Sequence, residues 1–532
     1  MLYYDTVRHL KPGQIAGRLQ AMAKDRMRRP RPVTLPPSLN GSLNPRTPFL
    51  YHDPWNGREQ LCDGRFRFLN HEEHLGWPVN WRAAETLPLL WQFNLHYFHY
   101  LHLLDGAERE EICKDWIRAN ALGSKPAWHP YPTSLRIVNW CKANLKSGEV
   151  QESIYQQAAF LFRNQETYHP GNHLLENARA LVFAGTYFGE QGEAPRWLER
   201  GLEIYERETP AQVLDDGGYF ERSPMYHALV LEGYLDVMNL HGNSHEAVPL
   251  IDAAKRMANF LITVTHPSGQ LALFNDSTQE IAPPTADLLD YGQRLTGYQA
   301  RKVTASSSGY FVDEAQDLYL IIDGGPIGPS FLPAHAHADI FSFELSVKQR
   351  PIVVDSGVCE YKAGEMRQYA RSTRAHNTVT VDKLDQAECW GSFRVARRFD
   401  PKDVSFRTDA EGSRFAGTFD GYGKLIGDQV IHQRSIVSTK ADRRIRVADR
   451  VSGTGKHLAE SMLHLHPSVA VQRDGNRLTL KCEEVECLLT VERGEVAIED
   501  GWYCPRFGVK ERNTVIAISG GVPCELAYTI SY

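Results

Sequence analysis

The chain has 532 residues, 42% of them hydrophobic and 23% charged, and its formal net charge is -6. A chain of this length is too long for one hydrophobic core, so we expect two or more domains. The acidic balance argues against a nucleic-acid-binding protein. The nine cysteines are scattered from Cys62 to Cys524 without paired spacing, which indicates reduced thiols rather than a disulfide framework.

No segment has the character of a signal peptide or a membrane span. The N-terminus reads Met1-Leu-Tyr-Tyr-Asp-Thr-Val-Arg, with an early acidic residue and no long apolar run. We therefore expect a protein that stays in the cytoplasm, and a periplasmic one only if the start of the gene is misassigned. The following residues, up to about 60, combine a basic helical pattern with a proline-rich stretch, which predicts an arm outside the core.

Apolar residues recur at intervals of three and four from about Trp91 to about Thr263, which predicts a run of amphipathic helices. Residues 134–142 and 172–183 are clear examples. Each follows a helix-start signal, Pro-Thr-Ser in the first case and Pro-Gly-Asn in the second. Helices stacked in antiparallel pairs over such a length form a bundle, a solenoid or a toroid.

From about Leu271 onward the pattern changes to short alternating runs of apolar and polar residues. These runs cover residues 318–322, 378–382, 444–448, 478–481 and 514–518. Asp-Gly pairs that are typical of tight turns occur at residues 323–324, 474–475 and 500–501. The C-terminal half is therefore predicted to be antiparallel β-sheet. We place the domains at residues 1–60, 61–285 and 286–532.

The segment Pro333-Ala-His335-Ala-His337-Ala-Asp339 lies just before the alternating run at residues 341–347. Side chains two apart on an extended backbone point the same way, so His335 and His337 should face one site. Neutral imidazole binds metals and carries protons near neutral pH. The pair therefore indicates a metal site, an acid–base site or both.

Four other polar segments are rich in aromatic residues. They cover residues 91–98, 129–136, 171–177 and 220–227. Aromatic rings beside amides and arginine suit a sugar-binding cleft. The side chains that we expect to contact the sugar are Gln92, Asn94, His96, Arg136 and Glu221. Arg136 would meet a carboxylate or sulfate, or else only pair with a helix neighbour.

Together these segments resemble the heparinase II/III superfamily of polysaccharide lyases, from about Trp91 to about Trp390. Four motifs in the family's order carry the resemblance: Asn172-His-Leu-Leu-Glu176; Ser223-Pro-Met-Tyr-His227; His335-Ala-His-Ala-Asp339 with Val354-Asp-Ser-Gly357; and Arg371-Ser-Thr-Arg-Ala-His-Asn-Thr378. The resemblance implies an α+β chain in which an incomplete N-terminal (α/α) toroid precedes a C-terminal antiparallel β-sandwich. It also implies β-elimination of a uronate-containing polysaccharide, which leaves a 4,5-unsaturated uronate.

The resemblance also assigns catalytic roles. Tyr226 and His335 correspond to the family's catalytic tyrosine and histidine, and Asn172 and His173 to residues at the substrate carboxylate. That carboxylate must be held by donors, because its charge makes the C5 proton poorly acidic and the transition state is enolate-like. A base then takes the proton and an acid protonates the leaving 4-oxygen. Without the resemblance, Asn172 after Gly171 would be read as a helix cap.

The same motifs place His337, Asp355 and His376 at positions that bind a metal, usually zinc, in relatives. Two imidazoles and one carboxylate leave one coordination place for water. We expect a divalent metal, Zn²⁺ first, to support the segment that presents His335 and not to act as the Lewis acid.

The expected partner is an acidic polysaccharide or oligosaccharide, with heparan sulfate-like glycosaminoglycans first and alginate or a bacterial exopolysaccharide next. Two other functions stay open. An inverting glycoside hydrolase would pair Asp215 or Asp216 with Glu221. A non-catalytic polysaccharide-binding protein of exopolysaccharide synthesis would bind the same chains without turnover. The oligomeric state is not indicated.

Overall fold

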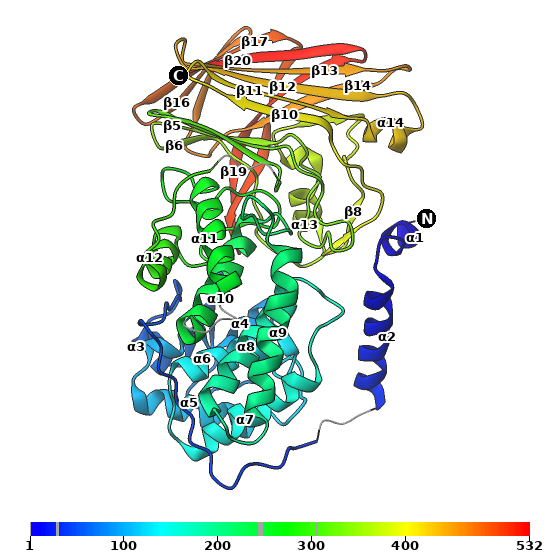
Figure 1. The fold of residues 1–532 in the computed structure, drawn as a ribbon. Helices are drawn as coiled ribbons and strands as arrows, with labels where there is room; N and C mark the ends of the chain where they lie inside the picture. Colours follow the sequence, from blue (N-terminus) through cyan, green and yellow to red (C-terminus); the bar gives the residue numbers. More distant parts are fainter. Residues whose placement is uncertain (1, 28–30, 243–247, 304–306) are drawn as a thin grey trace.

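A computed structural model of the protein describes residues 2–27, 31–242, 248–303 and 307–532 (Figure 1). Helices occupy one end of the molecule and antiparallel sheets the other, as predicted, and the N-terminal arm runs along one side (Figure 1). The nine cysteines are free thiols. Among the described helices, none is both long enough and apolar enough to cross a bilayer.

The helical domain has two layers of helices. Its main helices are α4 (Leu89–Tyr97), α5 (Gly106–Ala119), α6 (Pro130–Lys142), α7 (Gly148–Arg163), α8 (Asn172–Phe188), α9 (Ala194–Gln212), α10 (Pro224–His241), α11 (Val248–Thr263) and α12 (Thr285–Thr296). The inner helices α4, α6, α8, α10 and α12 contact one another in that order, and α5, α7, α9 and α11 pack outside them. Helices α8 and α10 are buried on nearly all sides, whereas α9 and α11 bury one face. Of the three predicted arrangements, this is the toroid.

The start of one helix differs from the prediction. Helix α8 begins at Asn172, as predicted. Helix α6 begins earlier than its predicted start, because His129 is the N-cap residue and Pro130 takes the first helical position, where proline has no hydrogen bond to lose. Helix α12 contacts α10 and α11 and so belongs to the helical layers, while the domain boundary at residue 285 stays a prediction.

The β domain contains three larger antiparallel sheets. The eight-stranded sheet has the order β10 (Lys402–Thr408), β11 (Gly412–Phe419), β12 (Ile431–Thr439), β13 (Arg444–Ser452), β20 (Cys524–Ser531), β17 (Val485–Arg493), β16 (Arg477–Cys482) and β15 (Ala470–Asp474). One four-stranded sheet has the order β18 (Glu495–Arg506), β19 (Val509–Gly521), β14 (Leu458–His464) and β7 (Val379–Val381), and the other β3 (Tyr310–Ala315), β4 (Leu318–Asp323), β5 (Phe343–Val347) and β6 (Arg350–Val353). One buried apolar cluster, with Ile436, Leu345 and Ile516 among its members, joins all three sheets into a sandwich.

The five predicted alternating runs fall on β4, β7, β13, β16 and β19. The Asp474-Gly475 pair turns between β15 and β16, with Gly475 at φ 62°. The turn predicted at Asp500-Gly501 is wrong, because both residues lie inside β18 and pair with β19. A local turn signal carries no information about the neighbouring strand that continues the ladder.

The smaller elements connect the two domains and the arm. They are α1 (Leu2–Val7), α2 (Pro12–Met27), α3 (Arg58–Cys62), β1 (Arg65–Phe68), β2 (His71–His74), α13 (Glu365–Ala370), β8 (Cys389–Trp390), β9 (Arg394–Val395) and α14 (Gly421–Ile426). Helices α1 and α2 of the arm lie outside the helical core (Figure 1), whereas Leu43, within the predicted arm, is buried in that core. Its α1 is held by Trp390, whose Nε1 donates to Thr6 Oγ1 at 3.1 Å, and its α2 begins beside Phe331, whose ring lies 3.7 Å from Lys11 Nζ.

Candidate active site

The N-terminal ends of α8 and α10 meet the loop that precedes β5. That loop, residues 335–339, was predicted to be extended like a strand, but it is irregular and β5 begins only at Phe343. The buried Glu221 joins the segments: its Oε1 accepts from the Asn172 backbone N–H at 3.3 Å, and its Oε2 lies 3.5 Å from His335 Nε2. The Tyr226 ring stacks on the His335 ring with centroids 3.9 Å apart. Asn172, Tyr226 and His335, which are far apart in the sequence, therefore lie in one site.

Gly171, and not Asn172, is the N-cap residue of α8, and no side chain caps this helix. A Cβ at Gly171 would lie 2.5 Å from Glu221 Oε1 and 2.8 Å from Leu332 Cδ2, so a larger residue there would have to displace the Glu221 carboxylate. The alternative role of Asn172 as a cap is therefore not realised. Its side chain stays available to a ligand.

His173 is paired with a buried carboxylate. Its Nδ1 lies 3.0 Å from Oε1 of the buried Glu166, its side chain is 34% exposed, and its ring lies 4.3 Å from that of Tyr131. Burial alone would lower the pKa of His173, but the charge of Glu166 and its hydrogen bond outweigh burial and raise that pKa above 6.5. The Glu166 carboxyl, despite its burial, has its pKa lowered to about 2, with His173 the main cause.

Tyr226 occupies the first turn of α10. Its backbone N–H donates to Oγ of the N-cap residue Ser223 at 3.2 Å, so the cap fixes the start of the helix that carries the ring. The Tyr226 hydroxyl lies 3.3 Å from the Tyr361 hydroxyl. Burial, with the neighbouring Tyr361, raises the pKa of Tyr226 well above 10. The phenol is therefore protonated near neutral pH and can donate its proton.

Asp276 organises the site and was missed in the sequence. Its Oδ2 lies 3.0 Å from His335 Nδ1 and its Oδ1 lies 2.9 Å from His337 Nε2. Both oxygens also accept from Arg367, the Oδ2 contact measuring 2.8 Å. Burial would raise the pKa of Asp276, but the Arg367 guanidinium and the hydrogen bonds hold it well below its usual value. Its one signal in the sequence is the polar run Asn275-Asp-Ser-Thr278 after an apolar stretch.

This carboxylate decides which nitrogen of each histidine carries the proton. A carboxylate only accepts, so Nδ1 of His335 and Nε2 of His337 must donate to Asp276. His335 then presents its Nε2 toward Glu221 and the stacked Tyr226, while His337 presents an unprotonated Nδ1 to the other side. The two histidines thus have different tasks, as the resemblance implies, although the backbone between them is not a strand.

A second cluster lies behind His335. One ligand atom each from His337, Asp339 and His376 lies within 4.8 Å of the others, and all three residues are buried. His337 Nδ1, Asp339 Oδ2 and His376 Nε2 are buried and have no hydrogen-bond partner among the described residues. Burial lowers the pKa of His337 to about 4, which keeps it neutral, and raises that of Asp339 to about 6. The charge of Asp355 and its hydrogen bond raise the pKa of His376 despite its burial, so a metal would have to displace any proton on that ring. Two imidazoles and a carboxyl, each with an atom that lacks a partner among the described residues, are a ligand set that fits a divalent metal.

Asp355, the predicted carboxylate ligand, lies outside this three-residue cluster. Its Oδ2 accepts from His376 Nδ1 at 2.7 Å and its Oδ1 from the Gly357 N–H at 3.1 Å. Asp355 therefore orients His376 much as Asp276 orients His337, the usual arrangement behind metal-binding histidines. Direct ligation by Asp355 stays a prediction, and Asp339 is the carboxylate that sequence reasoning did not assign.

The structure does not support a substrate role for His96 or Arg136. Arg136 is fully buried, stacks on Trp116 at 3.9 Å and donates to Gln157 Oε1 at 2.8 Å, which is the helix-neighbour alternative. His96 accepts from Trp116 Nε1 at 3.1 Å, and burial lowers its pKa to about 3. Both side chains belong to the core because the same aromatic residues that suggest a sugar cleft also fill helix interfaces.

The predicted substrate contacts of Gln92 and Asn94 stay predictions. Both side chains are buried, and their amides donate to backbone carbonyls of their own segment, Gln92 to Leu87 at 2.6 Å and Asn94 to Leu90 at 2.8 Å. Glu221, by contrast, lies within the site.

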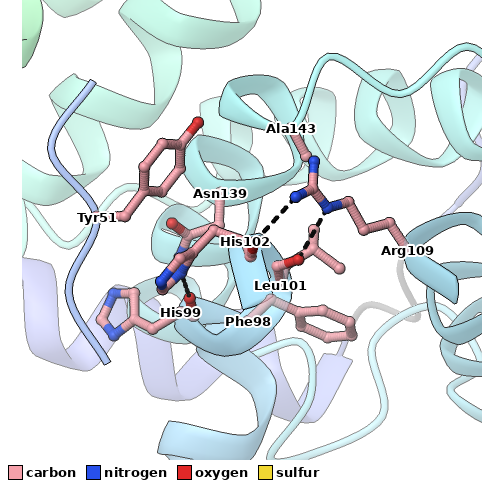
Figure 2. Close-up of a pocket in the computed structure, with 8 residues that line it drawn as sticks. All are labelled: Tyr51, Phe98, His99, Leu101, His102, Arg109, Asn139 and Ala143. Atoms are coloured by element: carbon pink, nitrogen blue, oxygen red, sulfur yellow. Dashed lines mark hydrogen bonds between the residues drawn. The ribbon is translucent and has the colours of Figure 1, made fainter. Parts of the chain in front are cut away.

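A pocket at the other end of α6 is separate from this site. Figure 2 shows Tyr51, His99, His102, Arg109 and Asn139 among its lining residues. Helix α6 starts next to Tyr131 and His173 and ends beside this pocket, and its 13 residues span roughly 20 Å. The Arg109 guanidinium donates to the carbonyls of Leu101 and His102 at 3.0 and 2.9 Å (Figure 2). Arg109 therefore stabilises the backbone at this end of the domain.

Comparison with known proteins agrees with the fold. Residues 144–291 match the family described as heparinase II/III N-terminus, and residues 299–529 the one described as heparinase II/III-like, C-terminal. A heparin-sulfate lyase of Pedobacter heparinus is 27% identical over 315 residues, 50% of this chain and 47% of that protein. One of Bacteroides stercoris is 29% identical over 254 residues, 41% and 37% of the two chains.

The alignments thus span about half or less of the length of these curated relatives. A crystal structure of heparinase III superposes with a TM-score of 0.72 at 17% identity and covers 97% of this chain and 89% of that one. That likeness confirms the predicted fold, a helical toroid followed by an antiparallel β-sandwich.

Proposed function

This chain belongs to the heparinase II/III family, and from that premise we propose that it is a polysaccharide lyase that cleaves a uronate-containing acidic polysaccharide by β-elimination. The observation that carries the proposal is the Tyr226 ring stacked on His335 at 3.9 Å, with Glu221 linking His335 to Asn172. Heparan sulfate-like glycosaminoglycans come first, because the curated relatives are heparin-sulfate lyases. Alginate or a bacterial exopolysaccharide comes second.

The substrate carboxylate would lie against Asn172 and His173. The Asn172 amide donates without adding charge, and His173, whose pKa is raised by Glu166, adds a positive charge. Together they would reduce the electron density on the carboxylate and stabilise the enolate-like transition state, which is where such donors have their largest effect.

Proton transfer would fall to His335 and Tyr226. With Nδ1 donating to Asp276, His335 would accept the C5 proton at Nε2, the nitrogen that lies 3.5 Å from Glu221 Oε2. Tyr226 keeps its proton because burial raises its pKa, so its hydroxyl would protonate the leaving 4-oxygen. Because the two rings are stacked, the proposed acid and base would act from one side of the sugar.

A polysaccharide panel tests this function against the two alternatives. Cleavage should produce the ultraviolet absorbance of an unsaturated uronate, with products of matching mass. New reducing ends without that absorbance would indicate a hydrolase and overturn the lyase. The hydrolase has less support, because Asp216 uses its Oδ2 on the Ser308 backbone N–H and hydroxyl and its Oδ1 on the Gly218 N–H. Binding without turnover across the panel would favour the non-catalytic role.

The second part of the proposal is a divalent metal, Zn²⁺ first, at His337, Asp339 and His376. When bound, the metal would supply charge that fixes the His337 loop. We expect about one ion per chain by mass spectrometry, an unfolding temperature that rises with added Zn²⁺, and weaker binding in Asp339→Asn. The pair of His457 with Asp382, which lies outside the cluster, provides the control, since His457→Ala should bind normally. If chelation leaves stability and turnover unchanged, the supporting role is wrong.

The raised pKa of His173 predicts a pH dependence of the Michaelis constant. Because the folded pKa lies above 6.5, His173 stays cationic below pH 6.5 and loses its charge as the pH rises through the folded pKa. We therefore expect KM for a uronate polymer to increase at alkaline pH. Glu166→Gln removes the anion that raises this pKa, so the increase should move to lower pH. The exposed pair of Glu203 with Arg200 is the control, and the same shift in Glu203→Gln would contradict the assignment.

A further inference from the structure

One aromatic side chain beside the candidate active site is left exposed to solvent. Phe393 is 41% exposed, and its ring lies 6.0 Å from the His335 ring and 5.2 Å from the Tyr361 ring, edge to face with both. The other exposed aromatic side chains in the described part of the chain are Tyr3, Tyr4 and Tyr51, which lie on the first 60 residues. An exposed ring at a site that must bind a ligand is a candidate contact surface.

The ring is held in place by the same groups that hold the catalytic histidine. Phe393 lies in the turn between β8 and β9, and the Ser392 carbonyl in that turn accepts from Arg367 Nε at 2.8 Å and Arg371 at 3.3 Å. The Arg367 guanidinium lies 5.3 Å from the Phe393 centroid and also binds Asp276. Because Arg367 connects Asp276 with this turn, the ring and His335 have a fixed relative position. A preformed contact surface costs little ordering on binding.

We propose that Phe393 is a substrate-positioning residue, the apolar platform on which one sugar ring of the polysaccharide stacks beside His335. The inference rests on the proposed lyase function. It adds a residue that contacts the sugar ring face, for which the proposed function names no partner. Asn172 and His173 can hold a carboxylate, but the C–H face of a pyranose requires an apolar partner. Tyr226 is already covered by the His335 ring, whereas Phe393 still has surface available.

The test compares Phe393→Ala, Phe393→Trp and the control Tyr51→Ala, whose side chain is also 41% exposed but lines the distant pocket of Figure 2. With heparan sulfate or whichever panel polymer is cleaved, we expect Phe393→Ala to raise KM by about tenfold or more. Its kcat should change by less than about threefold, since the ring touches no reacting atom. Phe393→Trp should restore KM, and Tyr51→Ala should keep it. The ratio of the KM of Phe393→Ala to the KM of the unmodified protein should not vary with salt, because stacking involves no charge.

Several results would overturn the platform. They are an unchanged KM in Phe393→Ala, an equal change in Tyr51→Ala, and a fall in kcat alone, which would mean that Phe393 only supports His335. Failure of the proposed function would look different, with no unsaturated product from the unmodified protein on any polymer. In that case, equilibrium titration of the same variants with a heparan sulfate hexasaccharide still decides the question. A loss of affinity in Phe393→Ala alone supports the platform, and equal affinities refute it.

Discussion

Replacing Tyr226 by phenylalanine is expected to lower kcat by roughly a hundredfold to ten-thousandfold, while oligosaccharide affinity stays within about tenfold. The substitution keeps the ring that stacks on His335 and removes only the hydroxyl, which lies 3.3 Å from that of Tyr361. Without the hydroxyl, the leaving 4-oxygen has no acid. The measurement is steady-state turnover by product absorbance, together with calorimetric titration of an oligosaccharide.

A matched control lies on the same helix. The buried Tyr234 hydroxyl lies 2.9 Å from Thr209 Oγ1, away from the site, so Tyr234→Phe loses a comparable hydroxyl without losing an acid. We expect near-normal kcat for this variant. If Tyr226→Phe retained more than about a tenth of the turnover, the tyrosine would not be the acid.

Replacing Asp276 by asparagine is expected to damage stability and turnover together. The substitution leaves the buried Arg367 without its counter-charge, which costs about 3–5 kcal/mol in the free energy of unfolding. It also replaces one of the two acceptor oxygens by an NH2 donor, so His335 and His337 can no longer both donate to this side chain, and kcat per folded molecule should fall by at least about a hundredfold. Denaturant unfolding measures the first effect, and active-site-normalised turnover the second.

The β-sandwich offers a control of the same construction. Asp449 is fully buried and binds Arg434, with Nε at 2.7 Å, and His432, with Nε2 at 2.8 Å. Arg434 also donates to the Asn377 carbonyl beside the candidate metal cluster, but none of its hydrogen bonds within the described residues reaches His335. Asp449→Asn should lose similar stability but keep its turnover per folded molecule. If the two variants lost turnover equally, Asp276 would be a structural residue only and not one that positions His335.

The sequence predicted the parts of the fold that depend on local pattern. Helical and alternating periodicities located the two domains, since a helix or strand that buries one face has apolar residues at regular short intervals. It failed where a distant strand or helix decides the outcome. Asp500-Gly501 has the composition of a turn, yet β19 pairs with it. Arg136 has the chemistry of a ligand contact, yet Trp116 covers it in the core.

For the candidate site, the sequence by itself determined which chemical groups are present, because Asn172, Tyr226 and His335 stand in short motifs. Only the tertiary structure decided how they are coupled. Asp276 lies some sixty residues from His335, in a run with no motif of its own, and it enters the site because the helical and β domains meet there. The proposed roles of Asp339 in metal binding and of Phe393 in sugar binding likewise depend on which segments lie beside them. Ligand geometry and exposure arise from packing between segments, which no spacing along the chain encodes.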